Sequence, residues 1–178
     1  MLPIGPLMIE HRLIERMIKV MDLEASRIEK EGVLNLVFIE KAVDFIRTYA
    51  DRCHHGKEEG ILFRELEEKN LSKEHKKIMG ELVEEHKLGR ELTGSLSKAR
   101  EMAAGGNHSQ VVAIVELMKK LVGFYPKHIE KEDKHFFMPV MGYFTDSEKE
   151  SMLKEGYEFD QQLIHNKYRG IVEEFENQ

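Results

Sequence analysis

Apolar residues recur at intervals of three and four along nearly the whole chain, a spacing that places them on one face of an α-helix. Leucine, glutamate, lysine and methionine are abundant, and only four prolines interrupt the pattern, so helix is favoured throughout. The pattern predicts four long helices and a fifth after them. Their approximate ranges are 6–29, 34–69, 73–104, 109–141 and a last helix that starts at 145.

Short breaks separate the predicted helices. They contain residue types that end or start helices, namely Gly32, Asn70-Leu71-Ser72, Gly105-Gly106-Asn107 and Pro139 with Gly142. Ser72 is a predicted N-cap, and Thr145 with Glu148 has the spacing of a capping box. Because the connections are short, we predict an all-α fold, an up-down-up-down four-helix bundle with an additional C-terminal helix. No linker divides the chain, so a single domain is expected over residues 1–178.

The composition narrows the classes of function. The 178 residues can bury a real core, 34% of them are charged, and the net charge is −6, which argues against general nucleic-acid binding. No apolar run reaches the ~18–20 residues that span a membrane, and the first residues lack the basic region of a signal peptide. The lone Cys53 excludes an internal disulfide framework. We therefore expect a cytoplasmic protein that binds neither membranes nor nucleic acids.

One short motif occurs twice. His54 and Glu58 are four residues apart on the second predicted helix, and His128 and Glu132 repeat this spacing on the fourth. Side chains four residues apart lie on the same helix face, so the imidazole and the carboxylate of each pair can chelate one metal ion. In both copies an acidic residue follows the glutamate, and a phenylalanine lies five positions after it. The matching surroundings favour a shared role over coincidence.

Two single histidines extend the pattern. His11 and His86 each occupy one position in the apolar seam of the first and the third predicted helix. A lone histidine on such a seam is more often a hydrogen-bonded core residue than a metal ligand. In a four-helix bundle, however, side chains on facing helices can meet in the core. The joint pattern of single histidines and His-x-x-x-Glu pairs therefore favours a metal site.

The second helix offers a choice between neighbouring pairs, because His55 and Glu59 have the same spacing as His54 and Glu58. Aligning Phe63 with the corresponding phenylalanine of the fourth helix favours the pair of His54 and Glu58. His55 and Glu59 are then expected to flank the ligands or to lie in the shell around them.

Two carboxylates and four or more imidazoles in the core of a bundle suit two metal ions about 3–4 Å apart, bridged by the carboxylates. Imidazole mixed with carboxylate, without thiolate, indicates non-haem iron, with zinc or another divalent ion as a substitute. Such a site can keep one position open for a small partner, either a diatomic molecule (O₂ or nitric oxide) or peroxide.

The ordered set of motifs resembles the haemerythrin-like, or HHE cation-binding, domain family, from about residue 4 to residue 175. Three sequence segments carry the resemblance: Leu7-Met8-Ile9-Glu10-His11, Cys53-His54-His55-Gly56-Lys57-Glu58-Glu59 and His128-Ile129-Glu130-Lys131-Glu132-Asp133. It implies a four-helix bundle with a non-haem di-iron centre, in which Glu58 and Glu132 bridge the ions. The ligands that it implies are His11, His54, Glu58, His86, His128 and Glu132.

The chain differs from the invertebrate oxygen carriers of this family in two motifs. They have a His-x-x-x-His helix and a late His-x-x-x-x-Asp motif, whereas the third helix here has one central histidine and the last motif ends in Glu132. Proteins that repair iron–sulfur centres are also similar, but they carry an additional cysteine-bearing N-terminal region. Simple reversible O₂ carriage is therefore not the expected function.

His165 on the C-terminal helix is a further candidate ligand, or else a surface histidine. It would complete a set of five imidazoles if this helix folds over the end of the bundle that holds His11 and His54. At about 1.5 Å of rise per residue the helix is long enough to do so.

Four functions fit these residues. The leading hypothesis is a di-iron protein that binds or senses O₂, nitric oxide or peroxide. An enzyme that metabolises peroxide or nitric oxide is an alternative, and so is storage or delivery of iron to damaged iron–sulfur centres. The fourth is a structural bundle with histidines in its core. No acid–base dyad is seen apart from the ligands, so whether the protein is an enzyme stays open.

Overall fold

The computed structural model describes the backbone of residues 1–107 and 109–176, and the side chains of residues 1–107 and 109–163. Its long helices are α1 (Ile4–Glu31), α4 (Lys73–Ala104), α5 (Gln110–Lys131) and α7 (Asp146–Glu176). The second predicted helix is a continuous series of shorter elements, α2 (Leu36–Phe45), η1 (Ile46–His55), η2 (Glu58–Phe63) and α3 (Arg64–Glu67). The described backbone contains no strand.

The fourth predicted helix is also divided, because α5 continues into η3 (Glu132–Phe136), α6 (Phe137–Val140) and the 3₁₀ turn η4 (Met141–Tyr143). The segments η1, η2 and η3 are π-helical. They contain or directly adjoin both His-x-x-x-Glu motifs. π-Helical turns inside α-helices are rare, and where they occur they are often at functional sites. Their position here therefore supports a functional role for these motifs.

The helix ends follow the predicted signals. Gly32 ends α1 with φ of 70°, a left-handed conformation that favours glycine. The Ser72 hydroxyl accepts a hydrogen bond from the backbone N–H of His75 at the start of α4. Before α7, the Thr145 backbone N–H donates to the Glu148 carboxylate, and the Glu148 N–H donates to the Thr145 hydroxyl. These bonds form the predicted capping box.

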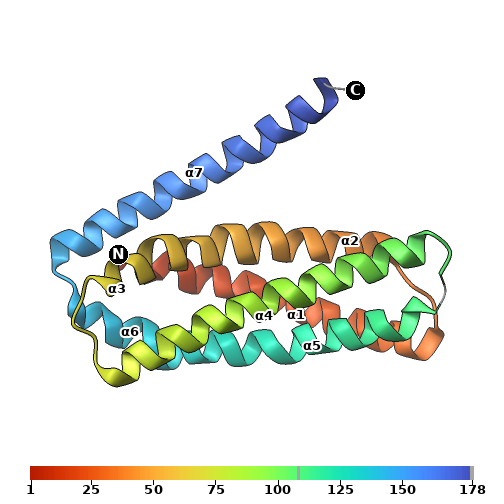
Figure 1. Cartoon of the computed structure of the whole chain (residues 1–178), viewed down its shortest axis with the longest axis horizontal. Helices are drawn as coiled ribbons and strands as arrows, with labels where there is room; N and C mark the ends of the chain where they lie inside the picture. Colours follow the sequence, from red (N-terminus) through yellow and green to blue (C-terminus); the bar gives the residue numbers. More distant parts are fainter. Residues whose placement is uncertain (108, 177–178) are drawn as a thin grey trace.

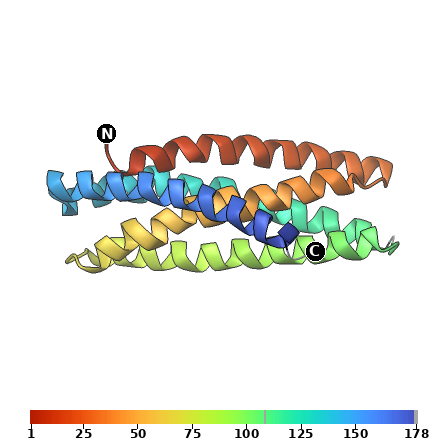
Figure 2. The same cartoon turned by 90° about the horizontal axis from the view of Figure 1, so that it is seen from above.

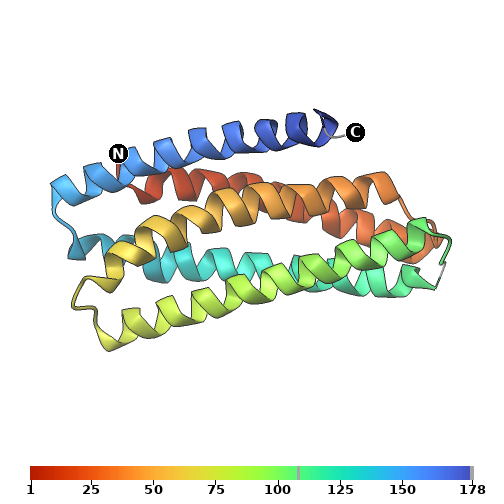
Figure 3. The ribbon, with the colours of Figure 1, turned by 45° about the horizontal axis from the view of Figure 1, so that its top comes forward.

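The helices form the predicted up-down-up-down bundle (Figures 1 and 3). Consecutive long segments run in opposite directions, and α5 packs against both α1 and α4. The series from α2 to α3 lies beside α4. The fifth helix, α7, lies along the outside of the bundle, where it contacts η1 and η2 (Figure 2). The predicted all-α bundle with an additional C-terminal helix is therefore confirmed.

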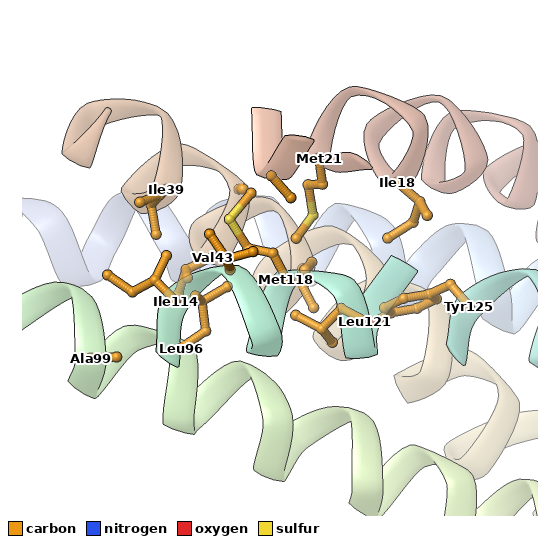
Figure 4. Close-up of a cluster of buried hydrophobic side chains, with 14 of the residues drawn as sticks. Ile18, Met21, Ile39, Val43, Leu96, Ala99, Ile114, Met118, Leu121 and Tyr125 are labelled. Carbon is orange, nitrogen blue, oxygen red and sulfur yellow. The ribbon is translucent and has the colours of Figure 1, made fainter. Parts of the chain in front are cut away.

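Two separate apolar clusters form the core. The larger one, partly drawn in Figure 4, joins α1, α2, α4 and α5 through side chains such as Met21, Leu96 and Met118. The smaller one, at the other end of the bundle, includes Leu7 of α1, Leu82 of α4 and apolar side chains of η2 and η3. Between the two clusters, every one of the four helical segments contributes buried polar residues. Burying polar groups between the two apolar clusters costs free energy unless these groups form hydrogen bonds or bind ions.

Among the described residues, no helix has the length and apolar composition that crossing a membrane would need.

Candidate metal centre

The buried polar layer contains two groups of potential metal ligands. In the first group, His11 of α1, His54 of η1, Glu58 of η2 and Glu132 of η3 each offer one atom within 4.8 Å of the others. All four side chains are buried. The Nε2 atoms of His11 and His54 are 2.8 Å apart, so both rings point their Nε2 edge at the same small volume.

The second group consists of three imidazoles from three elements, His55 of η1, His86 of α4 and His128 of α5. Each is at most 2% exposed. The His55 and His86 rings stack with centroids 3.9 Å apart, and His128 meets the His86 ring edge-on at 5.0 Å. The structure thus divides five histidines into a group of two and a group of three.

Glu58 joins the two groups through its two oxygens. Its Oε1 lies 3.4 Å from Nε2 of His54 in the first group, and its Oε2 lies 3.3 Å from Nε2 of His86 in the second. Glu58 therefore has one carboxylate oxygen beside each imidazole group.

Glu132 is placed in the same way. Its Oε2 lies 3.2 Å from Nε2 of His11, and its Oε1 lies 3.2 Å from Nε2 of His128. The same Oε1 is 3.7 Å from Nε2 of His86. Both glutamates of the repeated motif therefore face both imidazole groups.

The inward-facing atoms fit metal ions because most of them have no hydrogen-bond partner. All four oxygens of Glu58 and Glu132 are buried without one, and so are the Nε2 atoms of His55, His86 and His128. Buried polar groups are nearly always hydrogen-bonded, so this number of orphaned acceptors at one place requires an explanation. Bound cations would satisfy nitrogen and oxygen lone pairs together.

Outer carboxylates determine which imidazole nitrogen faces inward. Four of the five rings place Nδ1 within hydrogen-bond distance of an acidic side chain: His11 with Asp133 (2.8 Å), His54 with Glu10 (2.9 Å), His86 with Glu59 (2.6 Å) and His128 with Glu85 (2.8 Å). An ionised carboxylate only accepts, so Nδ1–H donates. In the neutral ring this leaves a lone pair on Nε2, which is how metal-binding histidines are commonly oriented.

A layer of cations surrounds these carboxylates. Arg12 pairs with Asp133, Lys57 with Glu10, and Lys131 with Glu85. Arg90 donates to both Glu59 and Asp51 at 2.8 Å. The outer carboxylates are thus held in place by cations from other elements.

The imidazoles and the carboxylates of the cluster shift one another's pKa values. Burial alone would lower the pKa of His54 and His86, but the surrounding carboxylates raise these values to about 10 and about 11. Burial and the neighbouring Glu58 would raise the pKa of Glu132, but His128, His11 and His86 hold it at about 2. Burial lowers the pKa of His55 to about 4. The carboxylates of the cluster therefore favour positive charge on His54 and His86, as they would favour a bound cation.

His55 is the functional candidate that sequence reasoning left at the flank of the site. The prediction treated the second helix as a regular α-helix and chose His54 over its neighbour. In a π-helix the hydrogen bonds join residues i and i+5, so the angle between consecutive side chains is smaller. Within η1 both rings consequently face the core, and they supply different groups. The sequence signal that could have identified His55 as a second ligand candidate is its position directly after His54. Glu59 does lie outside the cluster, as predicted, where it contacts His86.

The structure brings together six of the seven predicted site residues. They are His11, His54, Glu58, His86, His128 and Glu132. The side chain of the seventh, His165, lies outside the described residues.

Paired substitutions decide between His55 and His165 as the fifth imidazole. We expect His55→Ala to weaken metal binding at the three-histidine group by more than the 10–100-fold typical of losing an outer partner, because a direct ligand is removed. His165→Ala should leave two ions per chain. Elemental analysis after dialysis at limiting metal concentration measures both. If His165→Ala empties a position and His55→Ala does not, the sequence prediction of His165 holds instead.

A third acidic group lies next to the site but is already occupied by a lysine. Glu10, Cys53 and Asp160 offer atoms within 4.8 Å of one another. The Lys57 ammonium binds Glu10 and lies 2.7 Å from Asp160 of α7. The Cys53 thiol donates to Asp160, and burial raises the pKa of that thiol to about 12. This group is therefore an ion-pair network that attaches α7 to the outer partner of His54.

A helical bundle whose core holds His/Glu groups of this kind is the fold and site of a metal-cation-binding protein. The family model of the hemerythrin HHE cation binding domain matches residues 2–140, which is most of the chain. The chain therefore belongs to the hemerythrin HHE cation-binding family. Comparisons with curated proteins and with solved structures gave no significant match.

Proposed function

We propose that the protein holds two non-haem iron ions in this cluster and uses them to bind or sense a small molecule, O₂, nitric oxide or peroxide. His11 and His54 would hold one ion, and His55, His86 and His128 would hold the other. Glu58 and Glu132 would bridge them. The observation that carries this proposal is the pair of buried carboxylates, each with one unpartnered oxygen toward either imidazole group.

The choice of iron rests on the donors. Five imidazoles, two carboxylates and no thiolate suit iron, although zinc and other divalent ions can occupy such ligands. When bound, iron would supply a redox-active Lewis acid with a position for a small ligand.

The inequality of the two groups supports the binding of a small ligand. The ion between His11 and His54 would have one imidazole fewer than its neighbour, and so it would keep a position open. The His11 ring stacks on Phe137 with centroids 5.6 Å apart, and Phe137 is fully buried. This apolar ring beside His11 would exclude water and favour a small neutral ligand at the ion that His11 would hold. We propose that the protein does this in the cytoplasm.

Reconstitution with Fe(II) without oxygen, followed by exposure to air, tests this function. We expect two irons per chain, and charge-transfer bands of ferric iron in the near ultraviolet after oxidation. A matched sample loaded with Zn(II) should show no such bands. A chain that retains no iron after desalting would contradict the proposal. Catalytic turnover of peroxide or nitric oxide, in place of stoichiometric binding, would identify an enzyme.

A further inference from the structure

A cleft between η1 and α4 reaches the three-histidine group from outside. Ile46, Arg47, Asp51, Arg52 and His55 of η1 line one side. The other side comes from α4 and the bottom from α5, through Gly89, Arg90, Thr93, Gly94 and Tyr125. These helices lie side by side in the bundle (Figure 3). The cleft thus ends on an imidazole of the proposed metal centre.

Small residues on α4 keep this cleft open. Gly94 lacks a side chain, and the side chain of Thr93 donates its hydroxyl to the carbonyl of Gly89 at 2.7 Å. A Cβ atom added to Gly94 would meet no atom within 4 Å. The space next to Gly94 is therefore free, and a larger side chain at this position would extend into it.

His55 differs from the other four imidazoles in its outer contact. Their Nδ1 atoms donate to carboxylates at 2.6–2.9 Å, whereas Nδ1 of His55 lies 3.4 Å from Asp51 and makes no hydrogen bond. The ring is only 2% exposed. If Nε2 holds a metal ion, Nδ1 carries the proton. His55 then offers a buried N–H donor without an acceptor, beside an acidic residue that lines the cleft.

Tyr125 supplies a second unused donor. Its side chain is 2% exposed, and its hydroxyl makes no hydrogen bond with any described residue. Burial raises the pKa of this hydroxyl, and the charges of Asp51 and Arg90 act on it. Tyr125 lines the cleft together with both of these residues.

The mouth of the cleft is positively charged, although the chain carries a net charge of −6. Arg90 is neutralised by Asp51 and Glu59. Arg47 and Arg52 are exposed and form no ion pair within the described part of the chain. Two unpaired guanidinium groups over two buried donors are suited to an anion.

We propose that this cleft binds a small monovalent inorganic anion, which accepts hydrogen bonds from Tyr125 and from Nδ1–H of His55 and is attracted by Arg47 and Arg52. An anion at this place would supply the acceptor that Asp51 does not, and it would complete the outer contact of His55. This inference rests on the proposed function in one respect, because bound metal at Nε2 is what assigns the proton to Nδ1.

Nitrate is a suitable probe, since it coordinates metals weakly. We expect titration of the ¹⁵N-labelled, Zn(II)-loaded full chain at constant ionic strength to give saturable shifts of the Arg52, Thr93 and Gly94 amides. The ring N–H resonance of His55 should shift with the same Kd. Shifts that remain linear, or that spread over all basic surfaces, would overturn the proposal.

Substitutions with matched controls separate a site from general charge. Arg47→Gln with Arg52→Gln should weaken nitrate binding about tenfold, as expected for two lost charge-assisted contacts. The pair Arg16→Gln and Lys98→Gln removes the same charge from exposed positions outside the cleft and should change Kd less than twofold. Equal Kd values in the two double variants would overturn the role of the cleft.

A second pair of variants tests the space itself. Gly94→Leu should abolish the saturable shifts by filling the cleft. Gly80→Leu, at an open position of the same helix outside the cleft, should leave them unchanged. Metal analysis precedes each titration. A chain that retains no zinc would contradict the proposed metal centre. Nitrate titration of the metal-free chain, followed through the Arg52 and Thr93 amides, would then still show whether the cleft binds the anion.

Discussion

Replacing Glu58 or Glu132 by alanine should empty both metal positions together. Each carboxylate directs one oxygen at the two-histidine group and the other at the three-histidine group. Its loss would therefore remove a ligand from both proposed ions and take away the negative charge between them. We expect affinity at both positions to fall by more than the 10–100-fold that loss of an outer partner costs.

Elemental analysis of the purified variants measures this effect. Glu84→Ala is the matched control and should retain two ions per chain. Glu84 is an exposed glutamate on α4, and within the described part of the chain its ion pair is with Lys87 alone. Glu59→Ala should give an intermediate result, with weakening confined to the group that contains His86. A Glu58 or Glu132 variant that retains two ions would disprove bridging. Loss of a single ion would mean that the carboxylate serves one position only.

Metal binding should stabilise the fold, and the gain should increase with pH. A ligand present at 1,000 times its Kd contributes about 4 kcal/mol, which for a chain of this size raises Tm on the order of 10 °C per site. Treatment with a chelator should remove this stabilisation. The dependence on pH follows from the protons that the metal must displace.

The sign of that dependence comes from His54 and His86. Their pKa values in the metal-free fold are raised to about 10 and about 11. The stability that they contribute to the metal-free protein is fully present below the unfolded pKa of about 6.5 and is lost as the pH rises through 10 to 11. Metal ions require the neutral rings, so binding between pH 6.5 and 8.5 releases these protons. His55, with a pKa of about 4, is already neutral and releases none.

Apparent metal affinity should therefore rise up to tenfold per pH unit for each displaced proton, or about 1.4 kcal/mol. The chelator-induced decrease in Tm should be larger at pH 8.5 than at pH 6.5. Titration calorimetry with Zn(II) in buffers of different ionisation enthalpy counts the protons released. A metal affinity that is constant over this range would show that His54 and His86 are not the ligands that bind the ions.

The helices and their ends could be read from the sequence because their causes are local. Apolar spacing, the Ser72 cap and the Thr145–Glu148 capping box act within a few residues, and the structure confirms all three. Short connections then limit the topology to an antiparallel bundle. The repeated His-x-x-x-Glu spacing identified a buried His/Glu cluster for the same reason, since residues four apart must share a helix face.

Only the tertiary structure decided how the cluster is divided. His54 and His55 are neighbours in sequence, yet the π-helical turn of η1 sends them to different groups. The division depends on the rotation of each segment about its own axis, which packing against three other helices determines. Spacing along the chain carries no information about that rotation.

The outer contacts were equally invisible in the sequence. Asp133 meets His11 across 122 positions, and Glu85 meets His128 across 43. The attachment of Lys57 to Asp160 depends on where α7 packs. The sequence by itself determined the helices, the bundle and the kind of donors in the core, because these follow from periodicity and residue chemistry. The tertiary structure decided which nitrogen faces which oxygen, because those contacts join elements that no local rule relates.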